Sequence, residues 1–141
     1  MDVTERTLIL IKPDAIKKDV WLDIIRIYCQ NDLIVETTRI FEMSRQLAEE
    51  FYSDLKEHPV FERQIEHMTS GPIIALILSG EEAIRKVREL NGATNPANAK
   101  EGTVRNLYGV PNGNVNNAVH ASDSEKSFLK ESELIFTQNR P

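Results

Sequence analysis

The sequence predicts an α/β (α+β) fold of the split β-α-β kind, with helices packed on one side of a four-stranded, mainly antiparallel sheet. Apolar, β-branched runs typical of strands alternate with segments of helical spacing, in the order β-α-β-(α-α)-β-α-loop-β-α. No repeat, low-complexity stretch or linker interrupts this order. A chain of 141 residues is long enough for one hydrophobic core, so we expect a single domain over residues 1–141.

The first half of the chain is expected to form two strands and three helices. Thr7–Ile11 is a continuous apolar run, which is typical of a central strand buried on both faces. Apolar residues at helical spacing predict a helix over residues 21–28, and a segment rich in Val, Ile and Thr predicts a long strand over residues 33–43. A serine-capped helix is expected over residues 44–57, and a proline precedes a shorter helix over residues 61–68.

The second half combines two strands and two helices with a long loop. Ile73–Leu78 reads as a buried strand, and a helix is expected over residues 80–90, where Asn-Gly ends it. Residues 93–117 form a glycine-rich loop with a short helix at residues 103–108. Loops of this length in a compact domain are usually functional. A short strand and a last helix follow around His120.

Composition limits the classes of partner. Hydrophobic residues make up 40% and charged residues 28% of the chain, as in soluble globular proteins, and no apolar run is long enough to span a bilayer. The net charge of −5 argues against nucleic acid or acidic membrane as the main ligand, so specific cations must hold any polyanion. The single cysteine, Cys29, is expected in the core and fits a reducing cytoplasm, and we see no secretion signal.

His120 is the first candidate for chemistry. It lies in the run N-A-V-H-A-S-D-S at residues 117–124, which reads as a short strand leading into a helix. Ser122 and Glu125 have the spacing of a capping box, which would place His120 two residues before a helix N-terminus that favours an anion. An imidazole there is well placed to receive a phosphoryl group. The alternative is a histidine that merely fills the turn.

Glu131 makes the chemical interpretation stronger. Ser124, Phe128 and Ile135 define the inward face of the last helix, and Glu131 falls on the same face. A buried carboxylate is costly unless it is paired, and the helix must fold back on the strand that carries His120. A carboxylate on one ring nitrogen fixes the tautomer and leaves the other nitrogen free to attack. The alternative is a glutamate at the edge of the face that reaches water.

Four further side chains lie where solvated surface groups are not expected. Lys12 directly follows a buried strand, Arg88 lies close to the inward face of its helix, and Arg105 lies in the glycine-rich loop. Tyr52 shares an inward face with Ala48. Each could instead cover apolar surface with its stem and keep its polar end in water.

Taken with His120, these positions resemble the nucleoside diphosphate kinase family. The resemblance runs along nearly the whole chain, and its most specific motifs are K-P-D after the first strand and N-x-x-H-[GA]-S-D before the last helix. The segments that carry it are residues 7–14, 70–72, 92–96, 102–105 and 117–124. The family has the ferredoxin-like α/β sandwich fold, in agreement with the order of elements above.

The resemblance implies ping-pong transfer of a γ-phosphoryl group from a nucleoside triphosphate, such as ATP, to a nucleoside diphosphate through a phosphohistidine on His120. Ser122 and Glu131 would orient the imidazole. The residues that would bind nucleotide are Lys12, Arg88 and Arg105 at the phosphates, Thr94 and Tyr52 through their hydroxyls, and Asn117 with Lys12 at the sugar. Mg²⁺ would arrive with the nucleotide, without a protein cage. The resemblance also implies a homo-oligomer, either a tetramer or a hexamer.

The sequence departs from the family pattern at several positions. Val60 stands where we expect a phenylalanine that stacks on the base, although Phe61 follows it. Asn106-Leu107 replaces the usual Gly-Asp after Arg105, and an insertion of about two residues is expected at Asn112–Asn114. The altered loop leaves open a second interpretation, a nucleotide-binding or regulatory protein with weakened turnover. A P-loop or protein-kinase-type enzyme is excluded, because neither glycine motif is present.

Overall fold

A four-stranded antiparallel sheet forms the centre of the structure, which is a computed structural model that describes residues 4–113 and 115–137. The strand order is β2-β3-β1-β4, and each of the three neighbouring pairs is antiparallel. The strands are β1 (Thr4–Ile11), β2 (Ile34–Glu42), β3 (Pro72–Glu81) and β4 (Val119–Ala121). The predicted fold class is confirmed.

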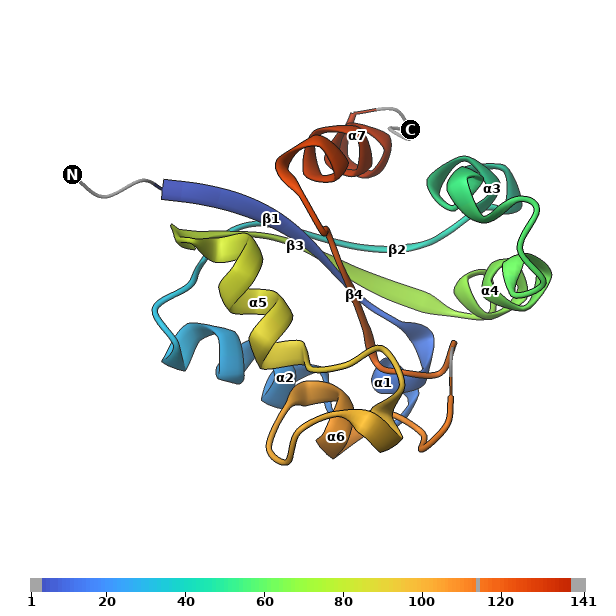
Figure 1. The fold of residues 1–141 in the computed structure, drawn as a ribbon. Helices are drawn as coiled ribbons and strands as arrows, with labels where there is room; N and C mark the ends of the chain where they lie inside the picture. The colour runs from blue at the N-terminus through green and yellow to red at the C-terminus, as the bar shows by residue number, and fades with distance from the viewer. Residues whose placement is uncertain (1–3, 114, 138–141) are drawn as a thin grey trace.

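Helices cover both faces of this sheet (Figure 1). One face carries α3 (Arg45–Phe51), α4 (Phe61–Met68) and α7 (Glu125–Phe136). The other carries α1 (Pro13–Lys17), α2 (Trp21–Gln30), α5 (Ala83–Asn91) and α6 (Val104–Tyr108). The expectation of helices on one side only was therefore wrong.

The reason lies in β1, whose side chains alternate between two separate cores. Leu8 and Leu10 belong to the core under α3, α4 and α7, whereas Ile9 and Ile11 belong to the core on the opposite face. All four side chains are fully buried. Since a strand with two buried faces must be covered twice, the predicted burial of this run already required two helical layers.

Local differences from the expected elements are small. The K-P-D segment ends β1 as expected, but Pro13 also begins α1, a helix that the sequence analysis did not predict. The helix expected over residues 44–57 ends at Phe51 and is followed by a 3-10 turn, Ser53–Leu55. A second 3-10 turn covers Pro96–Asn98 in the long loop. Among the described residues no helix is long and apolar enough to cross a membrane.

Cys29 is exposed, contrary to the expectation of a core residue. Helix α2 buries Ile24 and Tyr28 against the sheet. Cys29 is one residue beyond Tyr28, and a step of one residue turns the side chain by about 100° around the helix axis. The cysteine therefore points away from the core.

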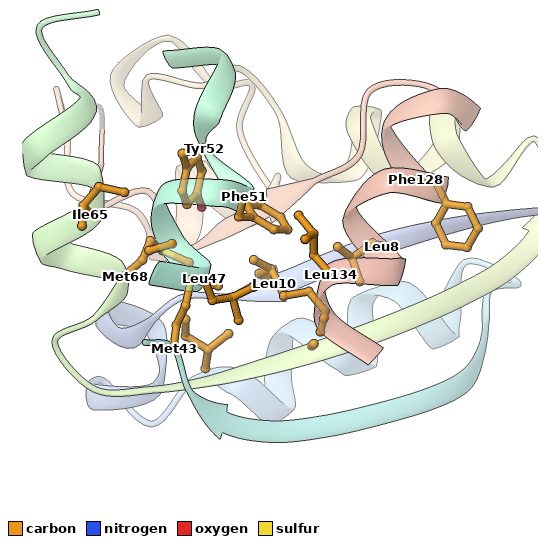
Figure 2. Packing of buried hydrophobic residues seen from close by; sticks show 14 of the residues in the cluster. Leu8, Leu10, Met43, Leu47, Phe51, Tyr52, Ile65, Met68, Phe128 and Leu134 are labelled. Carbon is orange, nitrogen blue, oxygen red and sulfur yellow. The ribbon is translucent and has the colours of Figure 1, made fainter. Parts of the chain in front are cut away.

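The pairing of β4 with β1 places His120. Leu10 is the direct partner of His120, and directly opposed residues of two antiparallel strands share a face. His120 therefore faces the core under α3 and α7. Figure 2 shows this core, in which Phe51 and Tyr52 lie between α3 and the sheet. The His120 ring contacts both edge-on, with ring centroids 5.1 Å from Phe51 and 6.2 Å from Tyr52.

Candidate active site

A polar cavity opens where β1 ends and β4 begins. It is lined by residues from five separate parts of the chain, which the sheet brings to one place. The lining residues are Lys12, Gln64, Arg88, Thr94, Arg105, Asn117, Val119, His120, Ala121, Asp123 and Glu131.

His120, Glu131 and Ser122 form a connected group at one side of the cavity. His120 Nε2 lies 2.9 Å from Glu131 Oε1, and Ser122 Oγ donates to the same oxygen at 2.8 Å. The His120 side chain is 21% exposed and that of Glu131 is 15% exposed. Because Glu131 occupies Nε2, Nδ1 is the ring nitrogen that remains for chemistry.

Ser122 is not the cap of the last helix, contrary to the expectation from its S-x-x-E spacing. The cap is Ser124, whose hydroxyl accepts from the backbone N–H of Ser127 at 3.1 Å, so His120 does not lie two residues before the helix. Ser122 is still paired with the sheet, since its N–H donates to the carbonyl of Leu8. Its hydroxyl is thereby free to hold Glu131.

Lys12 is almost completely buried and fully hydrogen-bonded. Its ammonium group donates to Asn117 Oδ1 at 3.0 Å, to the Val115 carbonyl at 3.1 Å and to Gln64 Oε1 at 3.5 Å. The side chain is 3% exposed. Burial lowers the Lys12 pKa from 10.5 to about 7, although Asp14 acts in the opposite direction. A ligand that contacts the Lys12 ammonium group would therefore compete with these three acceptors.

Asn117 joins Lys12 to the long loop. Its side chain is buried, and its amide group donates to the carbonyl of Thr94 at 3.0 Å. Thr94 itself is exposed at the rim of the cavity. The loop and β4 are thus fixed to each other at the point where Thr94 and Asn117 line the cavity.

Arg105 lines the cavity and connects the long loop to β4. Its guanidinium donates to the Gly92 carbonyl at 2.8 Å and to the Val119 carbonyl at 2.9 Å, while its Nε is buried and has no protein partner among the described residues. Burial lowers the Arg105 pKa. Arg88 is exposed and lines the same cavity, beside Asp123, whose pKa is lowered mainly by a hydrogen bond from Ser127.

Four of the residues expected at the site do not line the cavity: Ser122, which reaches it only through Glu131, and Tyr52, Val60 and Phe61. Tyr52 is buried behind His120, its hydroxyl has no partner in the described part of the chain, and burial raises its pKa. Val60 is half-buried and precedes α4, and Phe61 packs against the core of that face. Of the expected insertion, Asn114 lies outside the described residues.

Gln64 and Asp123 line the cavity but were missed in the sequence. Gln64 is 8% exposed on α4, beside the buried Ile65 and Met68. A polar residue on a buried helix face is the signal that identified Glu131, and it applied equally here. Asp123 lies within the motif around His120, in which a role was assigned only to the neighbouring Ser122.

The cavity offers little to bind a metal ion directly. Within residues 4–113 and 115–137 no group of three or more His, Cys, Asp or Glu side chains has the arrangement of a metal site. The two carboxylates that line the cavity are both engaged, Glu131 by His120 and Ser122, and Asp123 by the Ser127 hydroxyl at 2.6 Å. The remaining lining includes three cationic side chains, Lys12, Arg88 and Arg105.

A single antiparallel sheet, covered by helices on both faces, carries a histidine with a carboxylate behind it and cationic side chains in front. This arrangement defines a phosphotransferase of the ferredoxin-like α/β class. The chain belongs to the nucleoside diphosphate kinase family, whose family model matches residues 5–140.

Individual relatives agree with this assignment. The chain is 42% identical to the nucleoside diphosphate kinase of Lawsonia intracellularis over 132 residues, covering 94% of each chain. It is 43% identical to that of Staphylothermus marinus over 133 residues, covering 94% of this chain and 93% of the other. A crystal structure of the Aquifex aeolicus nucleoside diphosphate kinase is similar with a TM-score of 0.91, at 36% identity and 96% coverage of both chains. The apo enzyme from Encephalitozoon cuniculi gives a TM-score of 0.89, at 36% identity, with 98% of this chain and 90% of the other covered.

Proposed function

We propose that this protein transfers the γ-phosphoryl group of a nucleoside triphosphate to a nucleoside diphosphate in two steps, with His120 as the phosphoryl carrier. The contact between His120 and Glu131, at the edge of a cavity lined with cations, is the observation that carries the proposal. It provides a nucleophile, a group that orients it and a place for phosphates in one site.

The chemistry follows from the arrangement of the ring nitrogens. Nδ1 of His120 attacks the γ-phosphorus, the bond from that phosphorus to the bridging oxygen of the β-phosphate breaks, and the nucleoside diphosphate leaves. Positive charge develops on the imidazole, and Glu131 stabilises it through Nε2–H. Attack by the terminal oxygen of a second nucleoside diphosphate on the phosphohistidine reverses these bond changes and regenerates the free imidazole.

Phosphate binding is the second part of the proposal. Lys12, Arg88 and Arg105 line the cavity and would offset the charge of the phosphates, which a protein of net charge −5 must hold by specific cations. Asn117, already bonded to Lys12, would bind the sugar together with it. Thr94 would contribute its hydroxyl at the rim.

Three further residues are proposed to contact the nucleotide although they do not line the cavity. Tyr52 is buried against His120 and would approach the transferred group with its hydroxyl, which has no hydrogen-bond partner among residues 4–113 and 115–137. Val60 and Phe61, at the start of α4, would contact the base.

Mg²⁺ would be carried by the nucleotide. The engagement of both cavity carboxylates within the protein fits a metal that is held by phosphate oxygens and water. When bound, the ion would neutralise charge on the β- and γ-phosphates.

We further propose a cytoplasmic homo-oligomer, a tetramer or a hexamer. Large apolar side chains remain exposed on the isolated chain and are available for contact with a second copy. They include Leu22, Ile34, Ile40, Leu107 and Val110. Sedimentation equilibrium of the purified protein separates the two states from a monomer.

Labelling with γ-³²P-ATP tests the proposed function. The parent protein should acquire acid-labile label and pass it to added nucleoside diphosphate, and His120→Ala should do neither while keeping its fold. His58→Ala, which removes an exposed histidine, is the matched control and should label like the parent. A parent protein that binds ATP without acquiring label would instead support the nucleotide-binding or regulatory interpretation. Transfer by His120→Ala would show a direct mechanism without a carrier.

A further inference from the structure

Ala118, which connects Asn117 to the strand of His120, has a backbone conformation that L-residues rarely adopt. Its φ is +76°, and the residue is fully buried. A residue with a Cβ is disfavoured in the left-handed region, and it stays there only when its surroundings determine it. Contacts with surrounding residues must therefore hold Ala118 in this conformation.

Both backbone polar groups of Ala118 are held by residues that flank Pro13. The N–H of Ala118 donates to Asp14 Oδ2 at 3.0 Å. The carbonyl of Ala118 accepts from the backbone N–H of Lys12 at 2.9 Å. The junction of β1 and α1 thus holds the Ala118 peptide groups from both sides.

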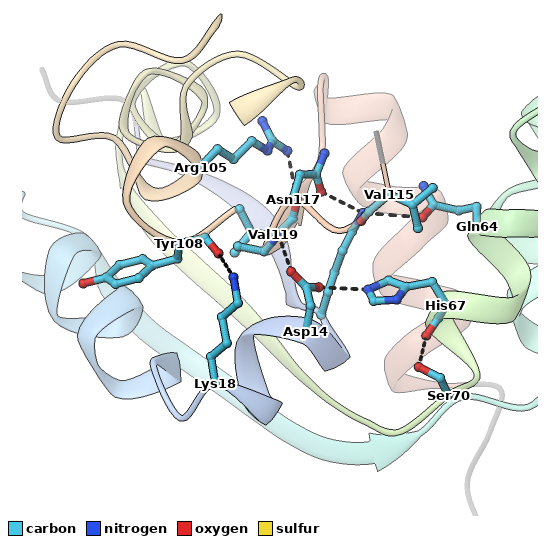
Figure 3. Close-up of polar contacts among 12 residues, drawn as sticks. Asp14, Lys18, Gln64, His67, Ser70, Arg105, Tyr108, Val115, Asn117 and Val119 are labelled. Carbon is cyan, nitrogen blue, oxygen red and sulfur yellow. Dashed lines mark hydrogen bonds and ion pairs between the residues drawn. The ribbon is translucent and has the colours of Figure 1, made fainter. Parts of the chain in front are cut away.

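Asp14 is fixed in turn by α4 (Figure 3). Its second oxygen, Oδ1, lies 2.8 Å from His67 Nε2. The side chains of Asp14 and His67 are only 8% and 15% exposed. The His67 end of α4 is closed by Ser70, whose hydroxyl donates to the His67 carbonyl at 2.6 Å. One carboxylate thereby links α4 to the backbone of Ala118.

The position of Ala118 determines what its two neighbours present to the cavity. Asn117, on one side, is bonded to Lys12 and to the Thr94 carbonyl. Val119 and His120, on the other side, begin β4 opposite Ile11 and Leu10. A change of φ at Ala118 would turn the Asn117 amide and the start of β4 relative to each other.

We propose that Asp14 is a positioning residue for phosphoryl transfer. Oriented by His67, it holds Ala118 in the left-handed conformation that presents Asn117 and His120 to the same nucleotide. The proposal rests on the proposed function, because its effect is measured at His120. Neither Asp14 nor His67 touches the reacting atoms.

The decisive measurement is the single-turnover rate of His120 phosphorylation at saturating ATP, in Asp14→Ala and Asp14→Asn. The asparagine oxygen can still accept from Ala118, and its amide can donate to His67, so Asp14→Asn should stay close to the parent rate. Asp14→Ala removes the acceptor and should slow the reaction by about tenfold or more, since small misplacements of reacting groups have effects of this size. Asp23→Ala, which removes a carboxylate from an exposed ion pair with Arg26, is the matched control.

A rescue variant separates positioning from a general loss of stability. Glycine adopts positive φ without steric cost. The double variant Asp14→Ala/Ala118→Gly should therefore react about threefold or more faster than Asp14→Ala alone. The folded fraction of each variant is measured by circular dichroism under the assay conditions, because Ala118→Gly also relieves backbone strain. Recovery of the rate between variants that are equally folded therefore reports positioning and not stability. Absence of recovery, or equal losses in Asp14→Asn and Asp14→Ala, overturns the proposal.

A second pair of variants decides the question if Asp14→Ala does not fold. His67→Gln keeps a donor for Asp14 and should retain the parent rate, whereas His67→Leu should slow phosphorylation several-fold. Equal rates in these two variants reject the positioning role. A parent protein that acquires no label rejects the proposed function itself, which distinguishes the two failures.

Discussion

Replacing Glu131 by glutamine removes the charge behind His120 and little else. The amide of glutamine is close in size to the carboxylate, and its oxygen can still accept from Nε2–H and from the Ser122 hydroxyl. The orientation of the imidazole is therefore largely kept. What is lost is the attraction between the carboxylate and the positive charge that develops on the ring as Nδ1 attacks.

The size of this loss follows from the geometry. His120 Nε2 and Glu131 Oε1 are 2.9 Å apart, and the centres of ring charge and carboxylate are somewhat further apart. Two unit charges about 4 Å apart interact by about 4 kcal/mol at an effective dielectric constant of about 20. A transition state with about half of the ring charge loses about 2 kcal/mol, which corresponds to a rate about 30-fold lower. The His120 and Glu131 side chains are mostly buried, which limits the screening of this interaction by water.

Rapid-quench measurement of His120 phosphorylation with saturating γ-³²P-ATP tests this value. Glu133→Gln, on the exposed side of the same helix, is the matched control and should react like the parent. ATP affinity should be nearly unchanged, because Glu131 lies behind the ring. A parent-like rate in Glu131→Gln would show that the charge contributes nothing, and loss of all labelling would show that the carboxylate does more than stabilise the ring.

Three further changes test other parts of the site. Because burial lowers the Lys12 pKa to about 7 and phosphates raise it again, nucleotide binding at about pH 8 should take up protons and weaken as pH rises. Calorimetry in buffers of different ionisation enthalpy measures this uptake, which Lys12→Arg should abolish. Ser122→Ala removes the hydrogen bond that the Ser122 hydroxyl donates to the Glu131 carboxylate, while the contact between Glu131 and His120 remains. A loss of about 1 kcal/mol should slow phosphorylation by about fivefold, less than Glu131→Gln; an equal or larger loss would contradict this ranking. Val60→Phe should lower the apparent KM for nucleoside diphosphates several-fold, since base stacking contributes about 1–3 kcal/mol, and an unchanged KM would remove the base-binding role from this segment.

The strands could be predicted from the sequence more accurately than the faces of the sheet on which the helices pack. The continuous apolar run of β1 predicted burial on both faces, and the structure agrees. The same observation excluded a one-sided arrangement, but the order of elements alone does not say on which face each helix packs. That choice depends on contacts between distant residues, such as those that place α5 and α7 on opposite faces of β1.

In the site, residues that break a burial rule were the easiest to find. Lys12 at the end of a buried strand and Glu131 on a buried helix face are costly without partners, so their partners could be sought. Gln64, a polar residue on a buried helix face, breaks the same rule but was overlooked. The cap assigned to Ser122 failed because Ser124 caps the helix although no Glu or Gln follows it at the third position. The pairing of Ser122 with β1, which local spacing does not reveal, keeps Ser122 in the sheet.

The contacts that complete the site also set the time at which it can form during synthesis of the chain. Lys12 binds the Val115 carbonyl across 103 residues, and Asp14 binds Ala118 across 104. At translation rates of about 5–20 residues per second, the first lysine waits about 5–20 s for its partners. Such distant contacts are also the slow ones in folding. The proposed phosphorylation of His120 would therefore require a chain whose synthesis and folding have brought these residues together.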